Sequence, residues 1–302
     1  MSAAPTDESV GRLSRDRLLA LLAMIGQDAS LDVRDAELVK FTNNAVFRLP
    51  RAGVVARIAG SLAVRQRVSK IVMVARWLAQ HDLPAVRLLP DLPQPLTVDG
   101  ELVTLWHEVP RVGPAPTGTE LGRILRRIHA LAAPPELPAW DPLDGIRTRL
   151  ADAEDLAEDD HTFLVAACDE TEAAVATVQY TLPPTLVHGD ATVANLIPDP
   201  HGPVICDFDS TSSGPAEWDL TPVAVGHLRF GSATNNQALL AASYGFDVTT
   251  WPGFPTFRRL RELQLVTSVV PVLRSNPSLR AQWRHRLETF RQGDTEARWR
   301  LY

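Results

Sequence analysis

The sequence predicts an α+β fold in two parts, an antiparallel sheet with a helix in the N-terminal part and a mainly helical remainder. The first observation is a set of three strand-like runs at 37–41, 45–49 and 54–58, which are joined by tight turns as in an antiparallel meander. The second is the pair Asp99-Gly100 between apolar runs, a strong signal for another hairpin. The third is the helical spacing of apolar residues in several later segments.

Helices are predicted where apolar residues recur every three or four positions, and Ser or Thr in front of such a run can cap its first turn. The predicted helices are 18–25 with the cap Ser14, 68–79, 121–131 with the cap Thr119, 260–270, and 279–290 with the cap Ser278. The strands thus come from the first part of the chain and most helices from the second.

Length and composition limit the class of protein. A chain of 302 residues is long enough for two lobes, which we place at 1–108 and 109–302. It contains no apolar run of membrane-spanning length and begins with polar residues that lack a secretory signal, so we expect a cytoplasmic protein without a membrane partner. Its net charge of −6 argues against a nucleic-acid binder. Cys168 and Cys206 are the two cysteines and form no disulfide or zinc framework.

The stretch 186–209 carries the clearest chemical pattern. It holds His188-Gly189-Asp190, then Asn195, then Asp207-Phe208-Asp209. Two short apolar runs flank the turn 199–202 and predict a β-hairpin between Asn195 and Asp207. Because a hairpin brings its two ends together, we expect Asn195 and Asp207 to face the same point.

These side chains suit a magnesium-dependent reaction. Mg²⁺ prefers oxygen ligands, which Asn195 and Asp207 supply, and Asp190 is left to accept a proton from an attacking hydroxyl. The spacing His-x-Asp-x-x-x-x-Asn is that of the protein-kinase catalytic loop, which is followed by a metal-binding Asp before Phe. Gly189 stands where that motif has arginine, and Asp209 stands where Asp-Phe-Gly has glycine.

The stretch resembles the aminoglycoside phosphotransferase and choline kinase-like family of small-molecule kinases, which have a two-lobed protein-kinase-like fold. The resemblance implies Asp190 as catalytic base, Asn195 and Asp207 as Mg²⁺ ligands, and Asp209 near a second metal or water. It also implies ATP or GTP as co-substrate and a hydroxyl of a small molecule as acceptor, with antibiotic modification among the roles. The later Gly214–Leu220 segment resembles a family motif whose aspartate, here Asp219, braces the catalytic loop.

The resemblance extends to the N-terminal lobe. It implies that the turn Thr42-Asn43-Asn44 covers the nucleotide phosphates; the turn lacks glycine, but asparagine tolerates left-handed backbone. Arg57 stands where a kinase has its phosphate-pairing lysine, and arginine can bind two phosphate oxygens at once.

Two further positions follow from the same resemblance. The segment 106–110 resembles the hinge, where the main chain of His107 and Val109 would contact the nucleotide base. A kinase also has a glutamate in the first helix of this lobe that pairs with the strand cation, but no glutamate lies between Gly60 and Gln80. Either another group orients Arg57, or the helix contributes its own cation to the phosphates through Lys70.

Two charge patterns bear on the acceptor. Residues 151–172 are strongly acidic, which would suit a cationic acceptor, but a solvated helix face also explains the run and is the favoured interpretation. The segment 258–300 has ten arginines and four acidic residues, which counts against an aminoglycoside and favours an anionic or neutral acceptor. His129, in the predicted helix 121–131, is interpreted as a hydrogen-bonded structural residue.

Two alternatives are weighed against an active kinase. The missing helix glutamate and the glycine-free turn would fit a nucleotide-binding pseudokinase that acts through a partner. The carboxylates of Asp190, Asp207 and Asp209 would fit a metal-dependent phosphoester hydrolase. The base and both metal ligands are intact, which favours the kinase.

Overall fold

The computed structural model describes residues 14–41 and 44–302, which fall into two compact units. The first unit contains the chain up to Gly113 together with 197–209, and the second contains 114–196 and 210–302. The chain therefore enters the first unit twice, the second time through the segment that carries Asp207 and Asp209. Thr42 and Asn43, two of the predicted nucleotide-binding residues, lie outside the described residues.

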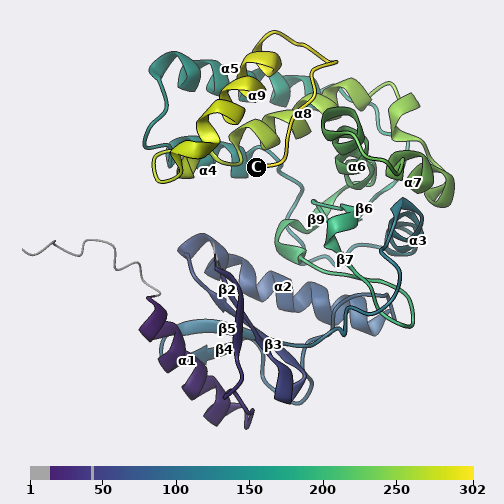
Figure 1. Cartoon of the computed structure of the whole chain (residues 1–302). Helices are drawn as coiled ribbons and strands as arrows, with labels where there is room; N and C mark the ends of the chain where they lie inside the picture. The colour runs from purple at the N-terminus through teal and green to yellow at the C-terminus, as the bar shows by residue number, and fades with distance from the viewer. Residues whose placement is uncertain (1–13, 42–43) are drawn as a thin grey trace, which may run out of the picture. The chain divides into compact units, whose positions relative to one another are not determined.

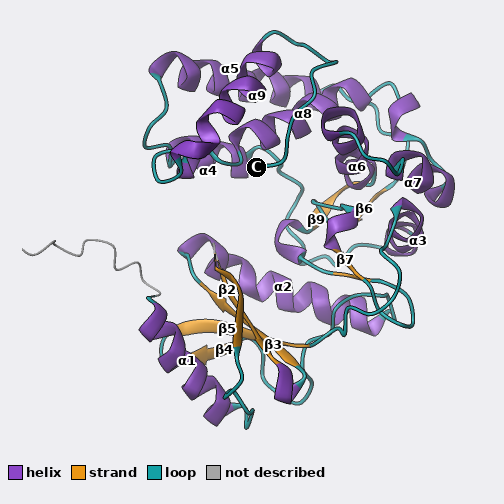
Figure 2. Ribbon diagram, viewed as in Figure 1, coloured by secondary structure: helices purple, strands orange, loops and turns teal. Residues whose placement is uncertain are grey.

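The first unit is built on a five-stranded antiparallel sheet (Figure 2). Across the sheet the strands are β1 (Glu37–Phe41), β2 (Asn44–Leu49), β3 (Val54–Ala59), β5 (Glu101–His107) and β4 (Leu96–Val98). The predicted meander and hairpin are thus confirmed. Asp99 and Gly100 between β4 and β5 both have positive φ, 46° and 77°, as a tight two-residue hairpin turn requires.

Two helices accompany this sheet, α1 (Arg15–Asp28) and α2 (Leu62–Gln80). Ser14 caps α1 as predicted, because its side chain accepts a hydrogen bond from the Arg17 amide at 3.2 Å. Four apolar residues of α1 from Leu18 to Ile25 are buried in one core with β2 and β3 residues such as Phe47. Burial of each large apolar side chain is worth about 1.5–3 kcal/mol, so this shared core fixes α1 against the sheet.

The second unit is mainly helical (Figure 1). Its helices are α3 (Gly118–His129), α4 (Asp144–Ala151), α5 (Glu158–Ala176), α6 (Glu217–Phe230), α7 (Asn236–Tyr244), α8 (Phe254–Thr267) and α9 (Arg280–Arg291). Strands β6 (Pro184–Val187) and β9 (Ser212–Pro215) pair in antiparallel fashion within it. Across the described ranges of the chain, none of the helices has the length and apolar character that crossing a bilayer would take.

Short elements complete the fold. Strands β7 (Leu196–Ile197) and β8 (Val204–Ile205) pair as the predicted hairpin. The 3-10 helices are η1 (Pro50–Ala52), η2 (Val193–Asn195), η3 (Phe208–Ser210), η4 (Val248–Thr250), η5 (Val270–Val272) and η6 (Pro277–Leu279). Two of them, η2 and η3, directly follow the segments that carry Asp190 and Asp207.

Two of the predicted helix caps are wrong. Helix α3 is capped by Thr117 and not by Thr119, because Thr117 forms a capping box with Glu120 three residues later. Ser278 does not cap α9: it lies inside η6, which begins at Pro277, and α9 starts at Arg280 without a side-chain cap. Proline presets the backbone for the first position of a helical turn, which moves the start of the turn ahead of Ser278.

Helices α3 and α7 approach each other closely at Gly122. A Cβ added there would lie 2.1 Å from Ser243 Oγ and 2.8 Å from the Leu240 carbonyl oxygen. We expect Gly122→Ala to lower the free energy of unfolding by about 1–3 kcal/mol through overpacking, as measured by urea denaturation. Gly226→Ala is the matched control, since this glycine is also helical but has open space around it; it should gain up to about 1 kcal/mol from helix propensity. Equal effects at both positions would contradict the close packing.

Candidate active site

A buried carboxylate holds the loop that carries Asp190. Asp219, in the first turn of α6, is fully buried. Its Oδ2 accepts a hydrogen bond from the His188 amide at 2.6 Å, and its Oδ1 accepts one from the Gly189 amide at 2.8 Å. Hydrogen bonds to an ionised acceptor are short and strong, so Asp219 fixes the two residues before Asp190. The predicted role of Asp219 as a brace is confirmed.

The backbone at Gly189 explains why glycine replaces the arginine of the kinase motif. Gly189 has φ +85°, and a Cβ there would lie 2.3 Å from the Ser210 carbonyl oxygen. A side chain would therefore be strained and would also collide with backbone. The Gly189 carbonyl in turn accepts a hydrogen bond from Trp218 Nε1 at 3.1 Å. Helix α6 thus binds both the amide and the carbonyl of Gly189, through Asp219 and Trp218.

Asp190 is presented to solvent and oriented by an arginine from α8. Its side chain is 42% exposed, and its Oδ1 accepts a hydrogen bond from Arg261 at 2.7 Å. Asn195 lies in the same unit, where its Nδ2 donates to the Asp190 carbonyl at 2.8 Å. That bond fixes the amide plane of Asn195. The second unit therefore brings together the predicted base and one predicted metal ligand.

His129 is a structural residue, as predicted. One ring nitrogen lies 2.9 Å from the Tyr244 hydroxyl and the other lies 3.2 Å from Asp219 Oδ2. The ring is nearly inaccessible, with 4% of the side chain exposed. It links α3 and α7 to the carboxylate that braces the catalytic loop.

Arg57 is oriented by Asp209 in the first unit. Its guanidinium lies 2.7 Å and 2.6 Å from the two carboxylate oxygens of Asp209. With its amide oxygen turned toward Arg57, Asn44 accepts hydrogen bonds from Nε at 3.2 Å and from the terminal nitrogen at 2.7 Å. Asn44, Arg57 and Asp209 are thus brought together, and Asp209 takes the orienting position that the missing helix glutamate leaves open.

Lys70 of α2 joins this cluster. Its Nζ donates a hydrogen bond to the Asp209 carbonyl at 2.8 Å. Burial and the nearby Arg67 charge lower the pKa of Lys70, and Asp209 opposes the change, so that the pKa is about 8. The first explanation for the missing glutamate is therefore seen in the structure, since Asp209 orients Arg57. Lys70 places a cation of the helix beside them, and its contact with phosphate stays a prediction.

Asp207 and Asp209 form a pair of oxygen donors suited to a cation. Burial by itself would raise the pKa of Asp209, but its interaction with the Asp207 side chain and the Arg57 charge bring that pKa below its ordinary value. Asp207 also has φ +70°, an uncommon conformation for a residue other than glycine that is often found at functional sites. Carboxylate pairs are suitable ligands for hard divalent cations.

Two main-chain amides of the predicted hinge, at 106–110, already donate hydrogen bonds within the first unit. The His107 amide donates to the Arg87 carbonyl at 2.9 Å, and the Glu108 amide donates to the Gly53 carbonyl at 2.8 Å. The Glu108 carboxylate pairs with Arg48. Main-chain contact with a nucleotide base at this segment would therefore fall to the carbonyl groups and to Val109.

The acidic run does not form a wall of unpaired carboxylates. Asp160, buried on α5, accepts 2.7 Å hydrogen bonds from both Arg284 and Arg291 of α9. Glu172 accepts from Arg147 of α4 at 2.7 Å. These carboxylates are thus paired with arginines both before and after the acidic run in the chain, and the ion pairs join α5 to α4 and α9 within the second unit.

Sequence reasoning missed Arg261 as a site residue. It lies 71 positions from Asp190 and is one of ten arginines in the segment 258–300. Arg258 and Arg259 stand just before it in the chain, so no local sequence signal identifies Arg261 as the arginine that contacts Asp190.

The chain matches a known family over most of its length. Residues 38–263 match the model of the phosphotransferase enzyme family APH. A comparison with curated proteins finds no match.

Solved structures share the fold at low sequence identity. The amicoumacin kinase hAmiN, solved with AMP-PNP, Ca²⁺ and Ami, has a TM-score of 0.72 and 13% identity over 94% of this chain and 98% of its own. The microcompartment-associated aminopropanol kinase has a TM-score of 0.68 and 18% identity over 92% and 99%. Spectinomycin phosphotransferase APH(9)-Ia, solved with ADP and spectinomycin, has a TM-score of 0.61 and 14% identity over 91% and 93%. The chain has the α+β protein-kinase-like fold and belongs to the phosphotransferase enzyme family.

Proposed function

We propose that the protein is a small-molecule kinase that transfers the γ-phosphate of ATP or GTP to a hydroxyl group. The observation that carries this proposal is the presentation of Asp190. Its carboxylate is half-exposed on a loop that the fully buried Asp219 holds rigid. A proton acceptor that is accessible and yet fixed in direction is what general base catalysis at a substrate hydroxyl requires.

The reaction is written as an in-line displacement. The acceptor oxygen forms a bond to the γ-phosphorus, the bond from that phosphorus to the β,γ-bridging oxygen breaks, and the nucleoside diphosphate leaves with the electron pair. Asp190 receives the hydroxyl proton. Catalysis would come mainly from positioning and charge stabilisation, with the base contributing about 10²–10⁴-fold.

Magnesium is the cation that fits the donor set. Asn195, Asp207 and Asp209 would hold it through amide and carboxylate oxygens, and it would offset the negative charge of the phosphates. Arg57 and Lys70 would bind phosphate oxygens, and the ion pair with Asp209 would hold Arg57 in place of the absent helix glutamate. That compensation favours an active kinase over a pseudokinase.

The acceptor is proposed to be a small molecule. Two of the structural relatives are named for antibiotics, amicoumacin and spectinomycin, and a third for aminopropanol. An antibiotic and a small metabolic alcohol are therefore the two classes to screen, with nucleoside diphosphate release as the readout.

Nucleotide binding should depend on magnesium and on Asp207. At about 100-fold excess over its dissociation constant, a ligand raises the free energy of unfolding by roughly 2.7 kcal/mol. We expect Mg²⁺ with ATP or GTP to raise the unfolding temperature of the wild type, and Asp207→Asn to reduce that increase, because one anionic ligand is lost. Thermal unfolding with and without Mg²⁺ measures it.

Asp91→Asn is the matched control for this experiment. Asp91 is an exposed aspartate of the first unit that, like Asp207, has positive φ, 62°. Asparagine tolerates this conformation as aspartate does, so both substitutions are neutral for the backbone. If neither nucleotide raises the unfolding temperature in a magnesium-dependent way, the kinase proposal is contradicted. If Asp207→Asn and Asp91→Asn reduce that increase equally, Asp207 is not part of the nucleotide site.

A further inference from the structure

A pocket within the second unit lies directly beside the catalytic loop. It has a volume of about 370 Å³ and is lined by Thr192, Val193 and Ala194, which follow Asp190 in the chain, and by Arg261 of α8. Small-molecule sites have volumes of about 300–1,000 Å³. Because Arg261 also donates to Asp190, the pocket and the proposed base share one side chain.

The walls of this pocket combine apolar side chains with cations. Val223 and Phe230 of α6 and Leu265 of α8 supply apolar surface. Arg261 and Arg286 supply positive charge, and none of the lining residues, all of them in the described part of the chain, is aspartate or glutamate. The arginine excess of the later segment therefore has a local counterpart at the pocket. Arg261 is paired there with Asp190 of the catalytic loop, whereas Arg284 is paired with Asp160 of α5.

Two buried nitrogens of the lining residues have no hydrogen-bond partner among the described residues. They are Nε of Arg286 and Nδ1 of His227. Arg286 itself is only 2% exposed, and a buried donor without a partner costs about 1–3 kcal/mol. Both residues line the pocket, and Nε of Arg286 is a donor at its wall that the protein leaves unsatisfied.

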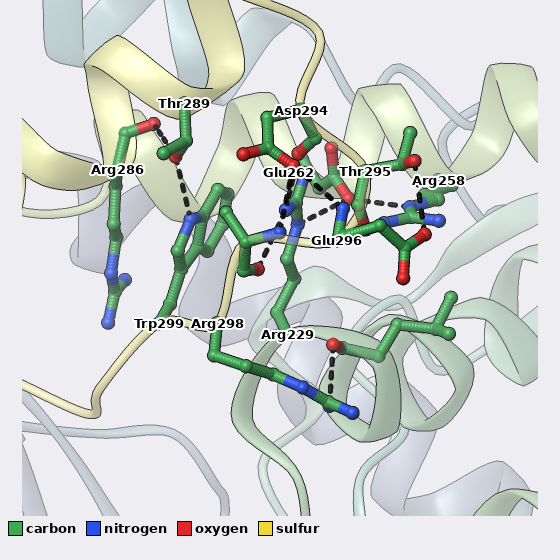
Figure 3. A network of polar contacts seen from close by, with 12 residues as sticks. Arg229, Arg258, Glu262, Arg286, Thr289, Asp294, Thr295, Glu296, Arg298 and Trp299 are labelled. Carbon is green, nitrogen blue, oxygen red and sulfur yellow. Dashed lines mark hydrogen bonds and ion pairs between the residues drawn. The ribbon is translucent and has the colours of Figure 1, made fainter.

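The segment 294–302 closes part of the pocket through Leu301 and Tyr302. Figure 3 shows how this segment is attached: buried Arg229 donates to Glu262 at 2.7 Å and to the main-chain carbonyls of Asp294 and Ala297 at 2.8 and 2.9 Å. Trp299 Nε1 donates to Thr289 at 3.0 Å.

At the pocket, the ring of Tyr302 lies over Arg286, with 3.7 Å from the guanidinium carbon to the ring centroid. An aromatic face and a guanidinium thus stand together in the wall.

We propose that this pocket binds the acceptor, and that the acceptor is a hydroxyl compound with an aromatic or apolar body and an anionic group. This inference rests on the proposed kinase function and narrows its substrate class. The apolar walls take the body, Arg261 and Arg286 take the anion, and the hydroxyl is held near Asp190 by the arginine that the two share. A polycationic acceptor is disfavoured, because it would bring ammonium groups against two guanidinium groups and no lining carboxylate.

Three matched probes test the charge preference directly. Mandelate, 2-amino-1-phenylethanol and 1-phenylethane-1,2-diol share a phenyl ring and a secondary hydroxyl, and differ in carrying a carboxylate, an ammonium or a neutral group. We expect mandelate to bind the full-length protein at least about tenfold more tightly than the amine, a difference of about 1.4 kcal/mol, by isothermal titration calorimetry. Tighter binding of the amine, or no binding of any probe, would overturn the inference.

Two variants locate the binding. Arg261→Gln should remove most of the preference for mandelate and leave the affinity for the neutral diol within about threefold. Tyr302→Ala, a substitution at an exposed position of the 294–302 segment, should weaken all three probes. Unchanged affinities in both variants would place the probes elsewhere and overturn the inference.

Magnesium-dependent stabilisation by ATP or GTP, measured on the same samples, separates the two proposals. If the nucleotide stabilises the protein and the probes show no charge preference, the kinase function stands and the acceptor class fails. If the nucleotide has no effect, the kinase function fails whatever the probes do.

Discussion

Asp190→Asn is expected to reduce acceptor-dependent release of nucleoside diphosphate by about 10²–10⁴-fold, the usual contribution of a general base. The substitution keeps the size of the side chain and an oxygen that can accept the 2.7 Å hydrogen bond from Arg261. It removes the ability to take up the hydroxyl proton. The loop should stay in place, because Asp219 holds it through the backbone of His188 and Gly189 and not through the Asp190 side chain.

The control for this loss is Asp199→Asn in the turn between β7 and β8. Asp199 is partly exposed, and its Oδ1 accepts a hydrogen bond from the His201 amide at 2.9 Å, a role that asparagine can fill. That variant should keep the wild-type rate. In Asp190→Asn, stabilisation by magnesium nucleotide should also persist, so that binding and chemistry are separated. A rate within tenfold of wild type would show that Asp190 is not the base.

The parts of the site that could be predicted from the sequence are those written in short, continuous motifs. The hairpin after Asn195 follows from two apolar runs around a Pro and Gly turn, and β7 and β8 form it. The brace at Asp219 follows from a motif 29 positions after Asp190, and the structure shows its bonds to the loop. In both cases the residues that define the feature lie close in the chain, so local pattern and spacing are sufficient.

The remaining features depend on contacts between distant segments. Arg261 is paired with Asp190 across 71 positions, and nothing in its neighbourhood distinguishes it from Arg258 or Arg259. Asp209 orients Arg57 across 152 positions, although the sequence indicated only that either another group orients Arg57 or Lys70 adds its own charge. Such pairings are decided by packing of the core, which the periodicity of one helix does not specify.

Asp219→Ala is expected to lower the free energy of unfolding by about 3–5 kcal/mol, the cost of removing one partner from a buried charged network. Three donors lose their acceptor: the amides of His188 and Gly189 and, at 3.2 Å, the ring of His129. None can turn to water, because the Asp219 side chain is fully buried. The unfolding temperature should fall by about 10 °C, and phosphoryl transfer should fall as well because the loop before Asp190 is released.

The matched control for Asp219→Ala is Asp141→Ala. Asp141 also accepts hydrogen bonds from two backbone amides, those of Leu143 and Asp144 at 3.1 Å each, but it is exposed. Water can replace its oxygens, so the loss should be about 1 kcal/mol, as for an ordinary cap. The two variants remove the same number of amide partners and differ in burial. Equal losses of unfolding free energy would mean that the Asp219 network is hydrated and does not hold the catalytic loop. If Asp219→Ala loses at least about 2 kcal/mol more than Asp141→Ala, about the difference between these two costs, burial is the reason that a single carboxylate can fix the base.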